Sequence, residues 1–395
     1  IKNSDTLKIT RYLVPHDDND YHQQVLIPSY LGKIIRNIMK KSSLALCVAL
    51  LFSQQGIANE TTTQEFNDIY RAYVAAVENK QDSSELAKKA FELGKEIYGE
   101  SADNTANLAI NYANSLAKSE QEQRFELYRT AYEILEKNHG KQSVQVYDSL
   151  IGMAESTPSA KRADTYLDDV IAIAEKQNSD KLVADAKMTA ARILAYKGTG
   201  ERYYTAKEYL EEADKYYQEN LPNNAVDRIS ADFLVAAFAE NQRKYSTAIE
   251  RLSHVVSVFD QELDFDHQTE LNAHSKLVHL YEKTGKSDEA TKHCLAIAKM
   301  VPWKESQEQE PLYRVPPKYP MSKAQRMEDG IVVMEFEVTP SGFVDNITVV
   351  DSEGGTAFER EAVKAMKKWR YAPKFENGQA IAATSRVQLD FKIKR

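Results

Sequence analysis

The amino-acid sequence predicts a protein with several domains, an all-α helical-repeat solenoid followed by a small α+β domain. Helical segments recur at a regular spacing through the middle of the chain, with few prolines among them. The end of the chain instead alternates apolar and polar residues with period two, around one helical segment. We therefore expect the solenoid over residues 59–301, a linker over 302–315 and a domain with an antiparallel sheet and a helix over 316–395.

Residues 39–58 have the pattern of a cleavable signal peptide. A methionine and two lysines precede an apolar run, and small residues lead up to a cleavage site between Ala58 and Asn59. The run is far shorter than the roughly 20 residues that span a bilayer. Lipid attachment at Cys47 is disfavoured because the bulky Leu46 precedes it. The pattern predicts export to the periplasm.

Residues 1–38 are mixed and polar and resemble no targeting sequence. They begin with isoleucine. We expect them to be an upstream extension from a start site placed too early. An N-terminal sequence of the mature protein that began before residue 39 would contradict this.

The predicted solenoid repeats itself. Residues 87–99 are echoed 41 positions later, by 129–140, with matching alanines, aromatic residues and terminal glycines. Looser copies follow at residues 166–177, 206–220, 248–263 and 287–300. A fixed period of this size is typical of stacked helical hairpins, and these copies resemble the longer variety of tetratricopeptide repeats. Stacked hairpins form extended grooves, so we expect the repeats to bind a second protein.

The C-terminal segment predicts two strands, a helix and a last strand. Residues 331–338 and 344–350 alternate apolar and polar side chains and are joined by a Pro-Ser-Gly turn, as in a hairpin. Thr356 and Glu359 have the spacing of a capping box, and Pro373 is expected to end the helix that follows. Residues 383–393 alternate again, as the final strand.

Four short motifs occur in a fixed order along this segment. They are Tyr-Pro at 319–320, Val-Thr-Pro-Ser-Gly at 338–342, Phe-Glu-Arg-Glu at 358–361 and Trp-Arg-Tyr-x-Pro at 369–373. Together they resemble the TonB C-terminal domain. The sequence departs from that family at Met327, where many members carry glycine, and at residues 316–318, where the best-known members carry a glutamine-containing run.

The resemblance implies a protein that binds other proteins and catalyses no reaction. In this family the domain binds the box peptide of an outer-membrane TonB-dependent transporter by adding the peptide to a strand edge. The residues that the resemblance assigns to strand pairing are Arg386, Val387, Gln388, Leu389, Asp390 and Phe391, and those beside them are Pro316, Pro317, Lys318, Tyr319 and Pro320. Tyr319, Trp369 and Tyr371 are explained more simply as core aromatic residues.

Charge divides at the same boundary as the fold. Residues 59–310 hold 30 Lys and Arg against 44 Asp and Glu, whereas residues 311–395 hold 14 against 11. The net charges are therefore −14 and +3. An acidic solenoid would repel the phosphates of nucleic acid, so we expect no nucleic-acid partner.

No pattern of a catalytic, metal or cofactor site emerges. His267, His274, His279 and His293 lie near Cys294, but their spacing does not match a metal pair on one helix face. Residues 197–201 are glycine-rich without the Lys-Ser/Thr of a phosphate loop and are expected to form a turn. We expect no cofactor, no metal and no small-molecule substrate.

Two functions remain open. In the first, the C-terminal domain binds a transporter and the repeats recruit an inner-membrane proton-driven complex or another partner. In the second, the chain is a periplasmic scaffold without energy transduction. Transducers of the family carry a permanent membrane helix and a proline-rich spacer, whereas residues 302–320 form only a short proline-containing linker.

Overall fold

The computed structural model describes residues 10–14, 60–197, 200–262, 267–301, 303 and 309–393. The expected signal peptide, its cleavage site and most of residues 1–38 lie outside these residues. Packing groups the chain into two compact units, one of residues 60–234 and one of residues 235–393 with the strand at 10–14. The part of the chain that is described contains no helix both long and apolar enough to cross a bilayer.

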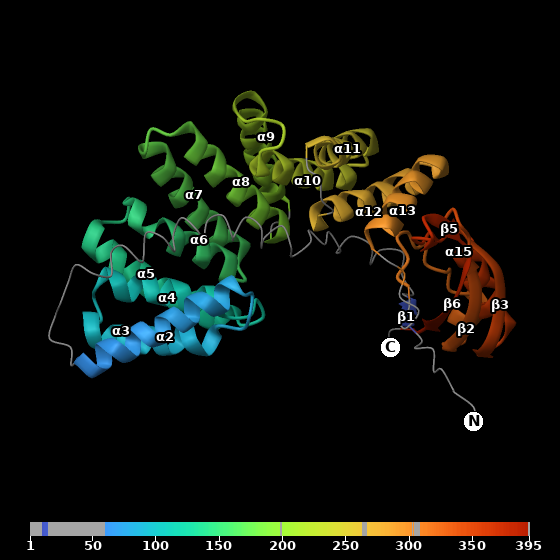
Figure 1. Ribbon diagram of the computed structural model, residues 1–395, viewed down its shortest axis with the longest axis horizontal. Coiled ribbons are helices and arrows are strands. Elements are labelled where there is room, and N and C mark those ends of the chain that lie inside the picture. The colour runs from blue at the N-terminus through green and yellow to red at the C-terminus, as the bar shows by residue number, and fades with distance from the viewer. Residues whose placement is uncertain are drawn as a thin grey trace. The chain divides into compact units, whose positions relative to one another are not determined.

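Within residues 60–234, the described part of the chain consists of helices joined by short turns (Figure 1). The elements are α2 Glu60–Glu78, α3 Ser84–Tyr98, α4 Asp103–Ser115, α5 Gln121–His139, the 3-10 helix η2 Val144–Val146, α6 Tyr147–Ser156, α7 Ala160–Lys176, α8 Asp180–Lys197, α9 Glu201–Asn220 and the start of α10 Val226–Asn241. From α2 to α9, each helix packs against the next one along the chain. The predicted stack of helical hairpins is confirmed.

Two glycines predicted to be equivalent end their helices in the same way. Gly99 follows α3 with φ 84° and ψ 157°, and Gly140 follows α5 with φ 89° and ψ 154°. Their N–H groups donate to the carbonyl oxygens of Lys95 and Glu136, respectively. Glycine is favoured here because other residues rarely adopt a positive φ. The repeat read from the sequence is therefore a structural repeat.

A buried alanine recurs in the later copies at intervals of 42 or 43 residues. These alanines, none of them exposed, are Ala163, Ala206, Ala248 and Ala290. Four residues after each alanine stands a second buried residue, namely Leu167, Leu210, Leu252 and Cys294. The small residue lets neighbouring helices approach closely, and the larger one fills the space between them. The last copy differs from the others in having a cysteine at the second position.

The second unit continues with helices and ends in an α+β domain (Figure 1). Its elements are α11 Tyr245–Glu262, α12 Gln268–Lys283, α13 Ser287–Met300, α14 Met321–Ala324, β2 Gly330–Val338, β3 Val344–Glu353, α15 Thr356–Met366, β4 Lys374–Glu376, β5 Gln379–Ile381, β6 Ala383–Phe391 and β1 Thr10–Val14. Helices α12 and α13 pack as an antiparallel pair, and residues 309–320 lead into the sheet domain.

The larger sheet has the order β1-β6-β2-β3. Strand β2 pairs antiparallel with both β3 and β6, in registers that include Val338 with Val344 and Met334 with Val387. Helix α15 packs on β2 and β3. The core between them is formed by the fully buried side chains Val332, Met334, Phe358, Ala362, Met366, Trp369, Leu389 and Phe391. The predicted strands are confirmed.

The helix differs from its prediction at both ends. The residue before its first turn is Gly355, and no side chain caps it. Glu359 accepts a hydrogen bond of 2.5 Å from the Ser352 hydroxyl on β3, so the capping-box prediction is wrong. The helix also ends at Met366, well before Pro373. Beyond this end the backbone pairs elsewhere: Arg370 donates its N–H to the Tyr313 carbonyl at 2.9 Å, a tertiary pairing that the sequence pattern does not contain.

A short hairpin, β4 with β5, was not predicted. Lys374 pairs with Ile381 and Glu376 with Gln379, around the dipeptide Asn377-Gly378. Both turn residues have positive φ, 51° and 78°. Asn-Gly is the preferred sequence of such a two-residue turn, so the signal was present in the sequence.

Candidate peptide-binding edge

Strand β6 is paired with the rest of its domain on one side only. Its inner neighbour is β2 along the whole strand, from Gly330 opposite Phe391 to Val338 opposite Ala383. Its outer edge lies beside β1, which comes from the other end of the chain. Of the domain's own strands, β6 is thus an edge strand, and a strand edge can accept an added peptide through main-chain hydrogen bonds.

The outer edge accepts an extended segment in parallel register. Thr10 lies opposite Val387, and Val14 lies opposite Phe391. The five residues of β1 pair with residues 387–391, which are five of the six β6 residues that the resemblance assigned to strand pairing. The backbone geometry of this edge is therefore compatible with a parallel added strand.

The two faces of β6 differ in chemistry. Val387, Leu389 and Phe391 are buried in the domain core. The alternate residues Gln388 and Asp390 lie on the other face of the sheet, where the Gln388 amide donates to the Asp390 carboxylate at 2.6 Å. A peptide added to β6 would therefore place alternate side chains beside an apolar and a polar surface.

Arg386 belongs to the polar face. Its guanidinium lies 4.0 Å from the Glu335 carboxylate on β2, its cross-strand neighbour. Glu335 is half exposed, so this pair is weakly held. A side chain on an added strand could therefore compete for either group.

The residues expected beside the strand form an extended segment against the core. Pro317 and Pro320 are buried, whereas Lys318 is exposed. Pro316 and Tyr319 are partly buried. Val315, the residue before this segment, is held to the core by a hydrogen bond: the Trp369 indole N–H donates to its carbonyl at 2.8 Å.

Tyr319 brings this segment to the end of β6. Its ring packs edge-on against Phe358 and Phe391, with centroids 5.5 and 5.9 Å apart. Its hydroxyl donates to the Glu328 carbonyl at 2.7 Å. Tyr319 is therefore a core-packing residue that lies next to the paired edge, while Trp369 and Tyr371 are buried core residues.

Met327 has a backbone conformation that explains the family's preference for glycine. Its φ is 52°, in the left-handed region, and its side chain is largely exposed. Gly330, three residues later, lies against Phe358, because a Cβ atom there would be 2.4 Å from the ring. The turn into β2 thus needs one unusual backbone conformation and one position without a side chain.

The histidines are distributed over several contacts. His274 and His293 meet between α12 and α13, whereas His279 pairs with Glu240 at 3.3 Å. His267 caps α12 by accepting from the Thr269 N–H at 3.1 Å. Within the described residues no three His, Cys, Asp or Glu side chains are placed to hold a metal ion. The spacing of the histidines along the sequence did not indicate that His274 and His293 would pair.

Residues 315–393 match the model of the Gram-negative bacterial TonB protein C-terminal family. The C-terminal domain is therefore a TonB C-terminal domain. A second family model, the cohesin loading factor, matches residues 152–315, which are mainly helical here.

Curated relatives match the same end of the chain. Protein TonB of Pseudomonas aeruginosa is 35% identical over 86 residues, which cover 22% of this chain and 25% of that protein. Protein TonB of Escherichia coli K12 is 43% identical over 63 residues, covering 16% of this chain and 26% of that protein. The chain thus spans about a quarter of the length of these relatives.

Two solved structures are similar to separate parts of the chain. The solution structure of the Pseudomonas aeruginosa TonB C-terminal domain is 34% identical and covers 22% of this chain and 90% of that one, with a TM-score of 0.21. TPR-like repeats of a Podospora anserina kinesin light chain are 19% identical and cover 49% of this chain and 92% of that one, with a TM-score of 0.42.

Proposed function

We propose that this chain is a periplasmic protein that binds the box peptide of outer-membrane TonB-dependent transporters along β6 and contributes to energy-coupled transport. The helical repeats recruit a second protein, such as an inner-membrane proton-driven complex. The observation that carries the proposal is the outer edge of β6, which accepts an extended strand in parallel register within a TonB C-terminal domain. Binding by strand addition needs no catalytic group or cofactor.

The second candidate is a periplasmic scaffold that binds proteins through both parts without transducing energy. It is favoured by the short connection between the helices and the sheet domain. Residues 302–308, together with residues 309–320, which we call the strap, are too few to cross the periplasm. The two candidates share the peptide edge and differ in whether the repeats contact an energised membrane complex.

Peptide binding can be tested with a probe taken from the chain itself. A fluorescent peptide of residues 8–16 is titrated into protein expressed from Met39, which lacks residues 1–38, and anisotropy reports binding. Peptides N-methylated at one residue at a time, from 10 to 14, then locate the main-chain hydrogen bonds. Strand addition predicts alternation, because successive N–H groups of a strand point to opposite sides.

The expected result is that N-methylation weakens binding at least tenfold at alternate positions and less than twofold between them. A transporter box peptide should compete for the same site. Equal effects at all positions, or binding that survives every N-methylation, would contradict strand addition. A peptide of the same composition in scrambled order is the control.

Partner capture separates the two candidates. Crosslinking in a Gram-negative host through residues of the repeat region should yield an inner-membrane proton-driven complex if the chain transduces energy. Fractionation of the protein expressed from Met39 supports an exported adaptor if a periplasmic species begins at Asn59. Capture of periplasmic proteins alone would favour the scaffold.

A further inference from the structure

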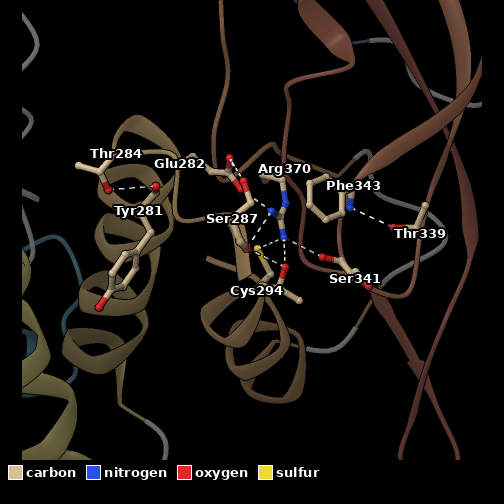
Figure 2. Close-up of polar contacts among 10 residues, drawn as sticks. Tyr281, Glu282, Thr284, Ser287, Cys294, Thr339, Ser341, Phe343 and Arg370 are labelled. Carbon is tan, nitrogen blue, oxygen red and sulfur yellow. Dashed lines mark hydrogen bonds and ion pairs between the residues drawn. The ribbon is translucent and has the colours of Figure 1, made fainter. Parts of the chain in front are cut away.

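Arg370 is a fully buried arginine at the junction between the C-terminal domain and the last helical hairpin. Arginine is almost never buried to this extent unless it is paired. Its guanidinium forms an ion pair with Glu282 at the end of α12, and the Glu282 side chain is only 10% exposed (Figure 2). Residue 370 follows α15, so this pair joins two segments that are far apart in the sequence.

The remaining contacts of the guanidinium come from both sides of the junction (Figure 2). On the helical side, it donates to the Thr291 hydroxyl at 2.7 Å and to the Ser287 carbonyl at 3.4 Å. On the domain side, it donates to the Ser341 carbonyl at 2.8 Å and lies 3.7 Å from the centre of the Phe343 ring. Charged hydrogen bonds and a cation–π contact thus fix one group from several directions.

The backbone of residue 370 is held as firmly as its side chain. Its N–H donates to the Tyr313 carbonyl at 2.9 Å, and its carbonyl accepts from the Leu312 N–H at 2.7 Å. The following N–H, of Tyr371, donates to the Gly342 carbonyl at 2.9 Å. The strap of residues 309–320 and the β2–β3 turn therefore meet at the same residue that contacts α12 and α13.

The helical side is adapted to receive this group. In the copies at Ala163, Ala206 and Ala248, a leucine stands four residues after the buried alanine, whereas α13 has Cys294. The Arg370 guanidinium lies 3.8 Å from the Cys294 sulfur. The apolar cluster of α13 is completed by Leu312, Tyr313 and Ala372, which belong to the strap and the sheet domain. These residues cover the face of α13 on which a further repeat would pack.

We propose that the TonB C-terminal domain is the cap of the last helical hairpin and forms one rigid body with α12 and α13, with Arg370 as its positioning residue. The functional part of this inference rests on the proposed peptide site. Strand β6 then moves together with α12 and α13, so a partner that displaces these helices displaces the bound peptide. A linker before residue 316 does not uncouple the two parts.

Cys294 reports on opening of this junction. The buried thiol reacts with maleimide only when the C-terminal domain separates from α13 or the helices unfold. With Cys47→Ser, Cys294 is the only thiol of the full chain, and intact mass follows its modification.

The test variant combines Arg370→Met with Glu282→Leu, which removes both charges and leaves no unpaired buried ion. The control is Arg360→Met, which removes an exposed arginine of α15.

We expect the double variant to be modified at least tenfold faster than the wild type and the control at the wild-type rate. A rate within twofold of the wild type in a folded double variant would overturn the proposal. If circular dichroism shows that the double variant is unfolded, Thr291→Val replaces it. That variant loses one hydrogen bond to Arg370, and it should be modified two- to fivefold faster; no increase would overturn the proposal.

Rigidity is measured directly between spin labels at Lys299→Cys on α13 and Lys364→Cys on α15, both exposed in the structure. A narrow distance distribution in protein that also carries Cys47→Ser, with Cys294 buried and unlabelled, supports one rigid body, and a broad one overturns it. Peptide affinity measured in parallel separates this inference from the proposed function. It should stay within threefold in the double variant, because the ion pair and hydrogen bonds of Arg370 go to α12, α13, the strap and the β2–β3 turn. If no peptide binds the wild type, the proposed function fails while the rigidity result still stands.

Discussion

The imidazole rings of His274 and His293 meet between α12 and α13, with their Nδ1 atoms 2.7 Å apart. At this distance one nitrogen donates its N–H and the other accepts, so the contact requires at least one neutral ring. The Tyr281 ring stacks on His293 with a centroid distance of 5.5 Å. Burial first, and then the neighbouring His274, lowers the pKa of His293 to about 4. Burial also lowers the pKa of His274.

This pair predicts loss of stability in mild acid. An unfolded histidine titrates near pH 6.5, so the contribution is fully present above that pH. As the pH falls from about 6.5 to about 4, the unfolded chain takes up protons that the folded chain does not. With allowance for partial exposure, the free energy of unfolding should fall by about 1–3 kcal/mol over this range.

The measurement is urea unfolding of the full chain at intervals between pH 7.5 and pH 4. His293→Asn cannot titrate and should flatten the dependence. Equal slopes in the wild type and His293→Asn would show that other groups cause the acid dependence.

Met327→Gly should stabilise the protein. The left-handed conformation costs a residue with a side chain roughly 1–2 kcal/mol, and glycine avoids this cost. Glycine also loses more conformational freedom on folding, which offsets part of the stabilisation. The expected increase in the free energy of unfolding is about 0.5–1 kcal/mol. Asn377→Gly, at φ 51° in the β4–β5 turn, is the matched control and should gain less, since asparagine tolerates this conformation. A loss of stability in Met327→Gly would mean that the methionine side chain makes a stabilising contact.

Gly330→Ala should destabilise the C-terminal domain by about 1–3 kcal/mol, as expected for an overpacked core. The added Cβ would lie 2.4 Å from the Phe358 ring, which is held by Tyr319 and Phe391. Gly94→Ala on α3 is the comparison, because its Cβ would lie 2.2 Å from one terminal methyl group of the buried Leu108 side chain rather than against a ring, and alanine favours the helix. Thermal unfolding compares the two. Similar transition temperatures in both variants would mean that the Phe358 ring moves away without cost.

Arg370→Met alone should cost about 3–5 kcal/mol, because it leaves the Glu282 carboxylate buried without its charge partner. The double variant with Glu282→Leu should recover most of this loss. Denaturant unfolding of both variants, with Arg360→Met as a surface control expected within about 0.5 kcal/mol, measures the difference. If the single and double variants are equally stable, the ion pair is not desolvated as the structure indicates.

The proposed peptide edge and the Arg370 junction lie in different parts of the domain, and the sequence predicted them to different extents. The β6 edge could be anticipated from the alternation of residues 383–391 and from the resemblance of the motifs around Trp369. The junction could not be anticipated, since Arg370 was simply part of a motif and Glu282 lay in another helix. The capping box failed for a similar reason: Ser352, on a neighbouring strand, offered Glu359 another partner.

The sequence by itself determined the features that depend on local periodicity. These are the repeating helices, the terminal glycines Gly99 and Gly140, and the alternating strands, because each needs only residues close in the chain. The tertiary structure alone decided which distant groups meet, as with His274 and His293, and where α15 ends. It also decided that Arg370 is buried against α12 and α13. Such contacts depend on how elements far apart in the chain pack, and local patterns do not encode that arrangement.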